Sequence, residues 1–78
     1  MTQIFYNISC SVRTPIGSLG FCFLQNTAHG SNIFMHREVL GRHNISLKTF
    51  ATVNTLTVDL QQQDDGRLRV IIIHSLDA

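Results

Sequence analysis

The sequence predicts an all-β protein, in which five strands form a small antiparallel barrel and residues 1–78 make a single domain. Three observations support this fold class. Apolar residues recur with a period of two, which is typical of strands with one buried face. Turn-forming Gly, Pro, Asn and Asp residues separate these segments at short intervals. Hydrophobic residues make up 44% of the chain and charged residues 14%, which excludes a disordered tail.

The first half of the chain is expected to contain three strands. The first covers residues 4–12, a turn-rich cluster follows at residues 14–18, and the second strand covers residues 19–24. A polar loop over residues 25–32 leads to the third strand, at residues 33–36. In the first strand the apolar residues alternate with polar ones, which describes a half-buried strand with one apolar face: Ile4, Tyr6, Ile8, Cys10 and Val12.

A long connection is predicted after the third strand. Residues 38–40 form a short helical turn that ends at Gly41, and residues 42–50 form a loop. Three apolar residues are expected to anchor this loop: Ile45, Leu47 and Phe50. A long connection between the third and fourth strands is typical of five-stranded Greek-key barrels.

The last two strands are predicted over residues 53–60 and 67–76. Asp65 and Gly66 between them give a hairpin turn signal. Residues 70–73 read Val-Ile-Ile-Ile, which is too apolar for a strand exposed on both faces. A free edge there would promote aggregation, so closure of the sheet into a barrel is favoured.

The second and third strands carry the most informative pattern, because side chains alternate between the two faces of a strand. If the loop between them is symmetric, Phe23 lies opposite Phe34 and Phe21 lies opposite His36. One face then carries four rings, which we expect to be exposed to solvent: Phe21, Phe23, Phe34 and His36. The other face then fills the core: Cys22, Leu24, Ile33 and Met35. If instead the Phe rings filled the core, the second set would be exposed, so an apolar face is exposed in either case and indicates a binding site.

These two segments resemble the two ribonucleoprotein motifs of bacterial cold-shock proteins, K-G-F-G-F-I and V-F-V-H-F. Residues 20–24 read G-F-C-F-L, and residues 33–36 read I-F-M-H, with Arg37 in place of the final Phe. The chain looks like a divergent member of that family. The resemblance is good over residues 12–40, whereas only strand spacing agrees over residues 53–76.

The resemblance implies a barrel of the oligonucleotide/oligosaccharide-binding type that binds single-stranded RNA or DNA with low sequence preference. An RNA chaperone or an antiterminator-like regulator would act in this way, by stacking unpaired bases on rings. Carried over by position, the stacking residues are Phe21, Phe23, Phe34 and His36. Arg13 takes the place of a phosphate-facing Lys, while Thr14 and Pro15 replace an aromatic pair and Leu19 replaces a Lys. We therefore expect modest affinity.

Cations outside the motifs are expected to assist. Arg37 follows the ring face directly, and Arg42 and Lys48 lie in the long loop that would flank it. Arg67 and Arg69 share a face of the fifth strand, where we expect them to serve solubility. The formal net charge is only +1, so attraction to nucleic acid depends on local placement. The alternative function is a protein-interaction or self-association module, such as a homodimer, that uses the same aromatic face.

Other classes of protein find little support in the sequence. Cys10 and Cys22 are too few for a disulfide scaffold and are expected to be buried apolar residues. The His and Cys residues lack the spacing of zinc sites, and no catalytic constellation occurs. We expect no metal, no cofactor and no enzymatic activity. No segment reaches the roughly 18 apolar residues of a transmembrane helix, and residues 1–12 do not resemble a signal peptide. We expect a soluble, cytoplasmic protein that does not bind membranes.

Overall fold

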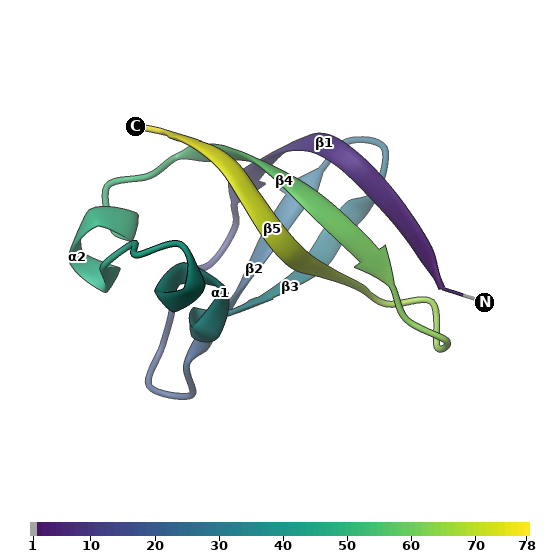
Figure 1. The fold of residues 1–78 in the computed structure, drawn as a ribbon, viewed down its shortest axis with the longest axis horizontal. Helices are drawn as coiled ribbons and strands as arrows, with labels where there is room; N and C mark the ends of the chain where they lie inside the picture. Colours follow the sequence, from purple (N-terminus) through teal and green to yellow (C-terminus); the bar gives the residue numbers. More distant parts are fainter. Residues whose placement is uncertain (1) are drawn as a thin grey trace.

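The computed structural model describes residues 2–78, which form five strands and two short helices. The strands are β1 (Gln3–Val12), β2 (Phe21–Asn26), β3 (Gly30–His36), β4 (Thr55–Gln62) and β5 (Leu68–Asp77). The helices α1 (Arg37–Arg42) and α2 (Leu47–Phe50) both lie between β3 and β4. Figure 1 shows the strands curling around one another, with the two helices at one end of the barrel.

The strands close into a barrel in the order β1-β2-β3-β5-β4 and back to β1, so the predicted five-stranded barrel of the oligonucleotide/oligosaccharide-binding type is confirmed. The prediction that all strand pairs are antiparallel is wrong for one pair: β3 and β5 run parallel and pair at Phe34 and Arg69. The reason is geometric. An odd number of strands cannot alternate in direction all the way around a closed barrel, so one neighbouring pair must be parallel.

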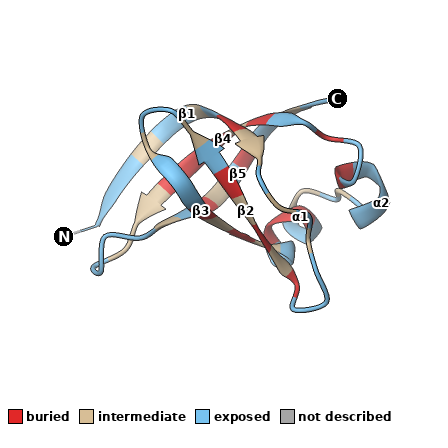
Figure 2. Ribbon diagram, turned by 180° about the vertical axis from the view of Figure 1, so that it is seen from behind, coloured by how far each residue is buried: buried red, intermediate tan, exposed pale blue. Residues whose placement is uncertain are grey.

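The core lies inside the barrel, and every strand contributes buried residues to it (Figure 2). The predicted inward set of the β2–β3 hairpin is at most 1% exposed: Cys22, Leu24, Ile33 and Met35. The other strands contribute Cys10, Leu56, Val58, Leu60, Val70 and Ile73. The connection between β3 and β4 adds Val39, Leu40, Phe50 and Val53. Full burial of one such aliphatic or aromatic side chain contributes about 1.5–3 kcal/mol, so this set is the main source of stability.

β1 departs from the predicted alternation at a β-bulge. Its register with β4 shifts between Phe5 and Ile8, and Asn7 in this interval has a φ of 54°. The extra residue reverses which face the preceding side chains of the strand point to, so Phe5 packs against the core. The prediction that Ile4 and Tyr6 share the apolar, core-facing side of the strand is therefore wrong, and Tyr6 is 67% exposed. The rest of that set lies in or against the core: Ile8, Cys10 and Val12.

The loop between β2 and β3 is shorter than predicted, because β2 ends two residues later and β3 begins three residues earlier than expected. β2 begins two residues later than predicted, and Leu19 is exposed in the turn that precedes it. Both strands extend into the predicted loop because Asn26 closes a tight turn. Its Oδ1 accepts the backbone N–H groups of Ala28 and His29 at 2.7 and 3.0 Å.

The connection between β3 and β4 contains more helix than predicted. α1 continues through Gly41 instead of ending there, and Ser46 caps a second helix, α2, inside the predicted loop. Of the three expected anchors, Phe50 is buried and Ile45 packs against the core. Leu47, the first residue of α2, is exposed, so it does not anchor the connection as predicted.

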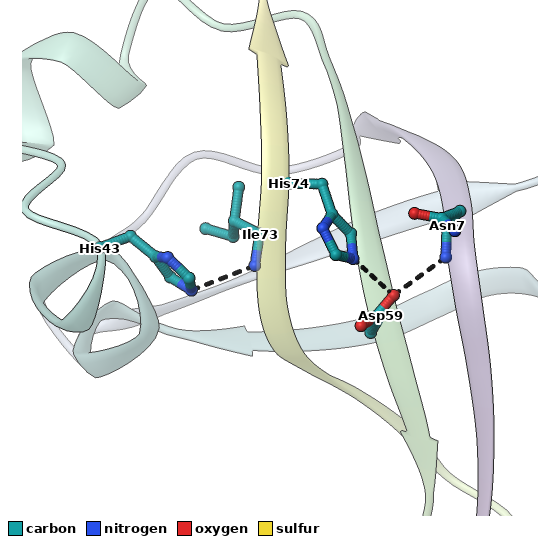
Figure 3. Close-up of polar contacts among 5 residues, drawn as sticks. All are labelled: Asn7, His43, Asp59, Ile73 and His74. Atoms are coloured by element: carbon teal, nitrogen blue, oxygen red, sulfur yellow. Dashed lines mark hydrogen bonds and ion pairs between the residues drawn. The ribbon is translucent and has the colours of Figure 1, made fainter.

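The predicted turn between β4 and β5 is confirmed, with Gly66 at a φ of 86°. The apolar edge of β5 is covered partly by a side chain rather than by a strand alone. β5 pairs with β3 at Arg69. Further along β5, the backbone N–H of Ile73 donates to Nε2 of His43 at 3.2 Å (Figure 3). His43 follows α1, so this bond ties the helical end of the barrel to β5 and caps a backbone donor at the edge.

Candidate nucleic-acid interface

The rings predicted to share one face do so, on the outer side of β2 and β3. Phe21 pairs with His36 and Phe23 pairs with Phe34, which is the predicted register. We call these four residues the aromatic face. They are half-buried rather than fully exposed, because the rings cover one another. Ring centroids lie 5.3 Å apart for Phe21 and Phe34 and 5.7 Å apart for Phe21 and Phe23.

His36 has a second role at the end of β3, where it caps α1. Its Nδ1 accepts the backbone N–H of Glu38 at 3.1 Å. In the neutral ring Nε2 therefore carries the proton. The capping bond fixes the ring beside Phe34, with a centroid distance of 6.4 Å, and leaves His36 with a donor for a ligand.

Arg13 is held at one edge of the aromatic face. Its Nε donates to the carbonyl oxygen of Ser31 at 2.6 Å, and its Nη2 donates to Oδ1 of Asn32 at 3.1 Å. These bonds place its Cζ 5.3 Å from the centroid of the Phe23 ring, within the range of a cation–π contact. The neighbouring Thr14 also contacts this strand, since its Oγ1 accepts the backbone N–H of Phe23 at 2.9 Å.

The three phenylalanines of the aromatic face line a groove of about 710 Å³. Its opposite wall is the β4–β5 hairpin, which contributes Gln63, Asp65, Arg67, Leu68 and Arg69. The structure thus brings Arg67 and Arg69, for which only a role in solubility was expected, to the groove. No local pattern in the sequence indicates this, because the strand order of the barrel, not proximity in the sequence, places β5 beside β3.

The two groove arginines are positioned differently. The Arg69 guanidinium donates to Oε1 of Gln61 from both Nε and Nη2, at 3.1 and 2.9 Å. The Arg67 side chain is 84% exposed, and its Nε lies 3.5 Å from the carboxylate of Asp65. Arg69 is therefore the better ordered of the two cations, and its forked hydrogen bond aligns it along the groove wall.

The remaining predicted cations divide between two sides of the molecule. Arg37 packs over Gly20 at the start of β2, where a Cβ added to Gly20 would lie 3.2 Å from Cδ of Arg37. Arg42 shares a smaller hollow with Phe34 and Arg69. Lys48 lies on α2, where Leu47 and Phe50 line a separate hollow against residues 12–16. Lys48 does not line the groove, so it is not brought to the aromatic face.

A polar cluster lies outside the groove, at the middle of β4. Asp59 is only 3% exposed, and its Oδ1 accepts the backbone N–H of Asn7 at 2.9 Å and Nε2–H of His74 at 2.8 Å (Figure 3). The two cysteines are buried in the core, as expected, and burial raises the pKa of both thiols to about 11. Such thiols are poor nucleophiles at neutral pH. Across residues 2–78, no helix is long and apolar enough to cross a membrane.

Comparison of the chain with protein-family models, with curated proteins and with solved structures finds no match. The fold and the groove define the class of protein: a five-stranded barrel of the oligonucleotide/oligosaccharide-binding type, with four rings on β2 and β3 and arginines on both sides of them.

Proposed function

We propose that this protein binds single-stranded RNA or DNA by stacking unpaired bases on the aromatic face, in the manner of a cold-shock RNA chaperone or regulator. One observation carries the proposal. Four rings lie together on adjacent strands, and a positioned arginine stands on each side of them, Arg13 at the β1 side and Arg69 across the groove.

The physical argument has two parts. Half-buried rings keep apolar surface exposed to solvent, and every base has a flat face that stacks on such a ring, for about 1–3 kcal/mol per base. The most nearly parallel rings are those of Phe21 and Phe34, with an angle of 33° between their planes. The flanking guanidinium groups would neutralise phosphates, and the bonds that hold Arg13 and Arg69 in place reduce the entropy lost on binding.

The proposal predicts that flat rings, and not merely apolar bulk, are needed for affinity. Replacing both rings, Phe21→Leu with Phe34→Leu, keeps much of the packing but removes two stacking platforms. We expect the dissociation constant for a fluorescent heptamer of thymidine to rise at least tenfold, with a modest change in the thermal midpoint. The matched control is Tyr6→Leu, which removes an exposed ring that does not line the groove and should leave the affinity unchanged.

Two results would contradict the proposal. Equal affinities of the wild type and the double variant would mean that bases do not stack on this face. A wild type that binds no oligonucleotide, but self-associates in sedimentation through the same two rings, would establish the alternative of a protein-interaction module. Circular dichroism of each variant checks that the barrel remains folded.

A further inference from the structure

The guanidinium group of Arg69 is held through one of its edges by an uncharged side chain. Arg69 lies opposite Gln61 in the β4–β5 pair and beside Phe34 of the aromatic face. Its Nε and Nη2 both donate to Oε1 of Gln61. Because these bonds use the Nε–Nη2 edge, the N–H groups of Nη1 and the second N–H of Nη2 remain for a ligand. Arg69 is exposed and lines the groove, so a ligand can reach it.

Arg13, on the other side of the rings, is held in the same way. Its Nε donates to the carbonyl oxygen of Ser31, and its Nη2 donates to Oδ1 of Asn32. In both arginines the Nε–Nη2 edge is therefore bound by uncharged oxygens, which leave the positive charge unneutralised. Arg67 differs, because its Nε lies near the carboxylate of Asp65. The two arginines that flank the aromatic face thus share an arrangement that suits an anionic ligand.

We propose that Gln61 is a positioning residue, which holds Arg69 in place and leaves its Nη1–Nη2 edge for a phosphate of the bound oligonucleotide. This inference rests on the proposed function and names the ligand group that Arg69 meets. Two parallel N–H groups on one guanidinium edge match two oxygens of a phosphate. An amide oxygen holds the guanidinium without competing for its charge, as a carboxylate would. Fixing a long side chain before binding also reduces the entropy that is lost on binding.

The test replaces Gln61 with two residues that separate the position of Arg69 from its charge. Gln61→Glu has nearly the same shape and still accepts from Arg69, but its carboxylate competes with phosphate. We expect the dissociation constant for the thymidine heptamer to rise about tenfold, and the slope of log affinity against log salt concentration to fall by about 0.7. Gln61→Leu keeps the charge of Arg69 but releases its guanidinium. The dissociation constant should then rise about threefold with an unchanged slope.

Three further measurements separate positioning from a purely structural role. In urea, Gln61→Glu should be at least as stable as the wild type although it binds less tightly, because its carboxylate pairs with Arg69. In the Arg69→Gln background, adding Gln61→Leu should not change the affinity, because no guanidinium is left to position. The matched control is Gln3→Glu, which places the same charge on an exposed residue of β1 that does not line the groove. It should keep the wild-type slope and nearly the wild-type affinity.

The possible outcomes distinguish this inference from the function on which it rests. Wild-type affinity in either Gln61 variant, or an equal loss from Gln61→Leu with and without Arg69, overturns the role of Gln61. A Gln61→Glu protein that is less stable than the wild type would make its weaker binding a structural effect and would also overturn that role. In each case the proposed function stands if the wild type binds the heptamer. If the wild type does not bind, the proposed function fails, and the role of Gln61 fails with it.

Discussion

Asn7 determines how the first strand lies on the barrel. Its φ of 54° is in the left-handed region, which asparagine tolerates better than most residues because its short polar side chain forms local hydrogen bonds. This conformation creates the bulge that turns Phe5 towards the core and Tyr6 towards solvent. It also directs the backbone N–H of Asn7 at Asp59.

A pair of substitutions at Asn7 tests this assignment. Asn7→Ala places a Cβ in a left-handed conformation and should lower the free energy of unfolding by about 1 kcal/mol. Asn7→Gly lacks that Cβ and should differ from the wild type by no more than about 0.5 kcal/mol. Urea unfolding of the three proteins measures both values. Equal stabilities of the alanine and glycine variants would mean that backbone conformation does not select the residue here.

Among the elements, β4 is central because it joins two bulged strands. On one side β1 has its bulge at Asn7, and on the other the register with β5 shifts so that His74 is the extra residue. Asp59 lies between them and accepts a hydrogen bond from each. Burial alone would raise the pKa of Asp59. The hydrogen bond from Asn7, together with the hydrogen bond and charge of His74, outweighs burial and holds the pKa below its usual value.

The lowered pKa of Asp59 predicts a specific acid sensitivity. A carboxylate with a depressed native pKa contributes stability that is fully present above its unfolded pKa, about 3.9, and is lost as pH falls through the native pKa. Asp59→Asn keeps an acceptor for Asn7 but loses the charge. It should lower the free energy of unfolding by about 1–2 kcal/mol at pH 7 and make stability less dependent on pH below about 4.

Urea unfolding between pH 2 and 7 measures this difference. The matched control is Asp64→Asn, in the exposed turn after β4, which should unfold with nearly the wild-type stability at pH 7. Parallel pH profiles of the wild type and Asp59→Asn would show that Asp59 is not the carboxylate responsible.

These elements also show what sequence alone could predict. The register of β2 and β3 was predictable for two reasons. One set of alternating residues had to fill the core, and a symmetric loop between the strands places Phe23 opposite Phe34. The bulge at Asn7 was not predictable, because its acceptor, Asp59, lies 52 residues away in the sequence. The exposure of Tyr6 could not be predicted for the same reason, since a bulge reverses the orientation of the side chains on one side of it.

At the scale of the whole molecule, barrel closure decides which cations meet the rings. Sequence proximity favoured Arg42 and Lys48, in the connection that follows β3. The structure instead places the β4–β5 hairpin, with Arg67 and Arg69, across the groove. The pairing of β3 with β5 joins residues 35 positions apart and is parallel, so no local pattern in the sequence indicates it.

This arrangement predicts how binding depends on salt. Each phosphate neutralised on a single strand contributes about 0.7 to the slope of log affinity against log salt concentration. Arginines near the aromatic face are Arg13, Arg37, Arg42, Arg67 and Arg69. The slope for a thymidine heptamer should therefore lie between about 2 and 3.5, depending on how many of the five engage phosphate.

Single substitutions locate the path of the bound oligonucleotide across the barrel. Arg69→Gln should reduce the slope by about 0.7 and weaken binding to all sequences, because a positioned guanidinium on the groove wall is lost. Lys48→Gln removes a cation that lies on α2, away from the groove, and should leave both slope and affinity unchanged. Titrations at four salt concentrations measure each slope. If Lys48→Gln lowers the slope and Arg69→Gln does not, the phosphates lie along α2, and the oligonucleotide does not bind in the groove between β3 and the β4–β5 hairpin.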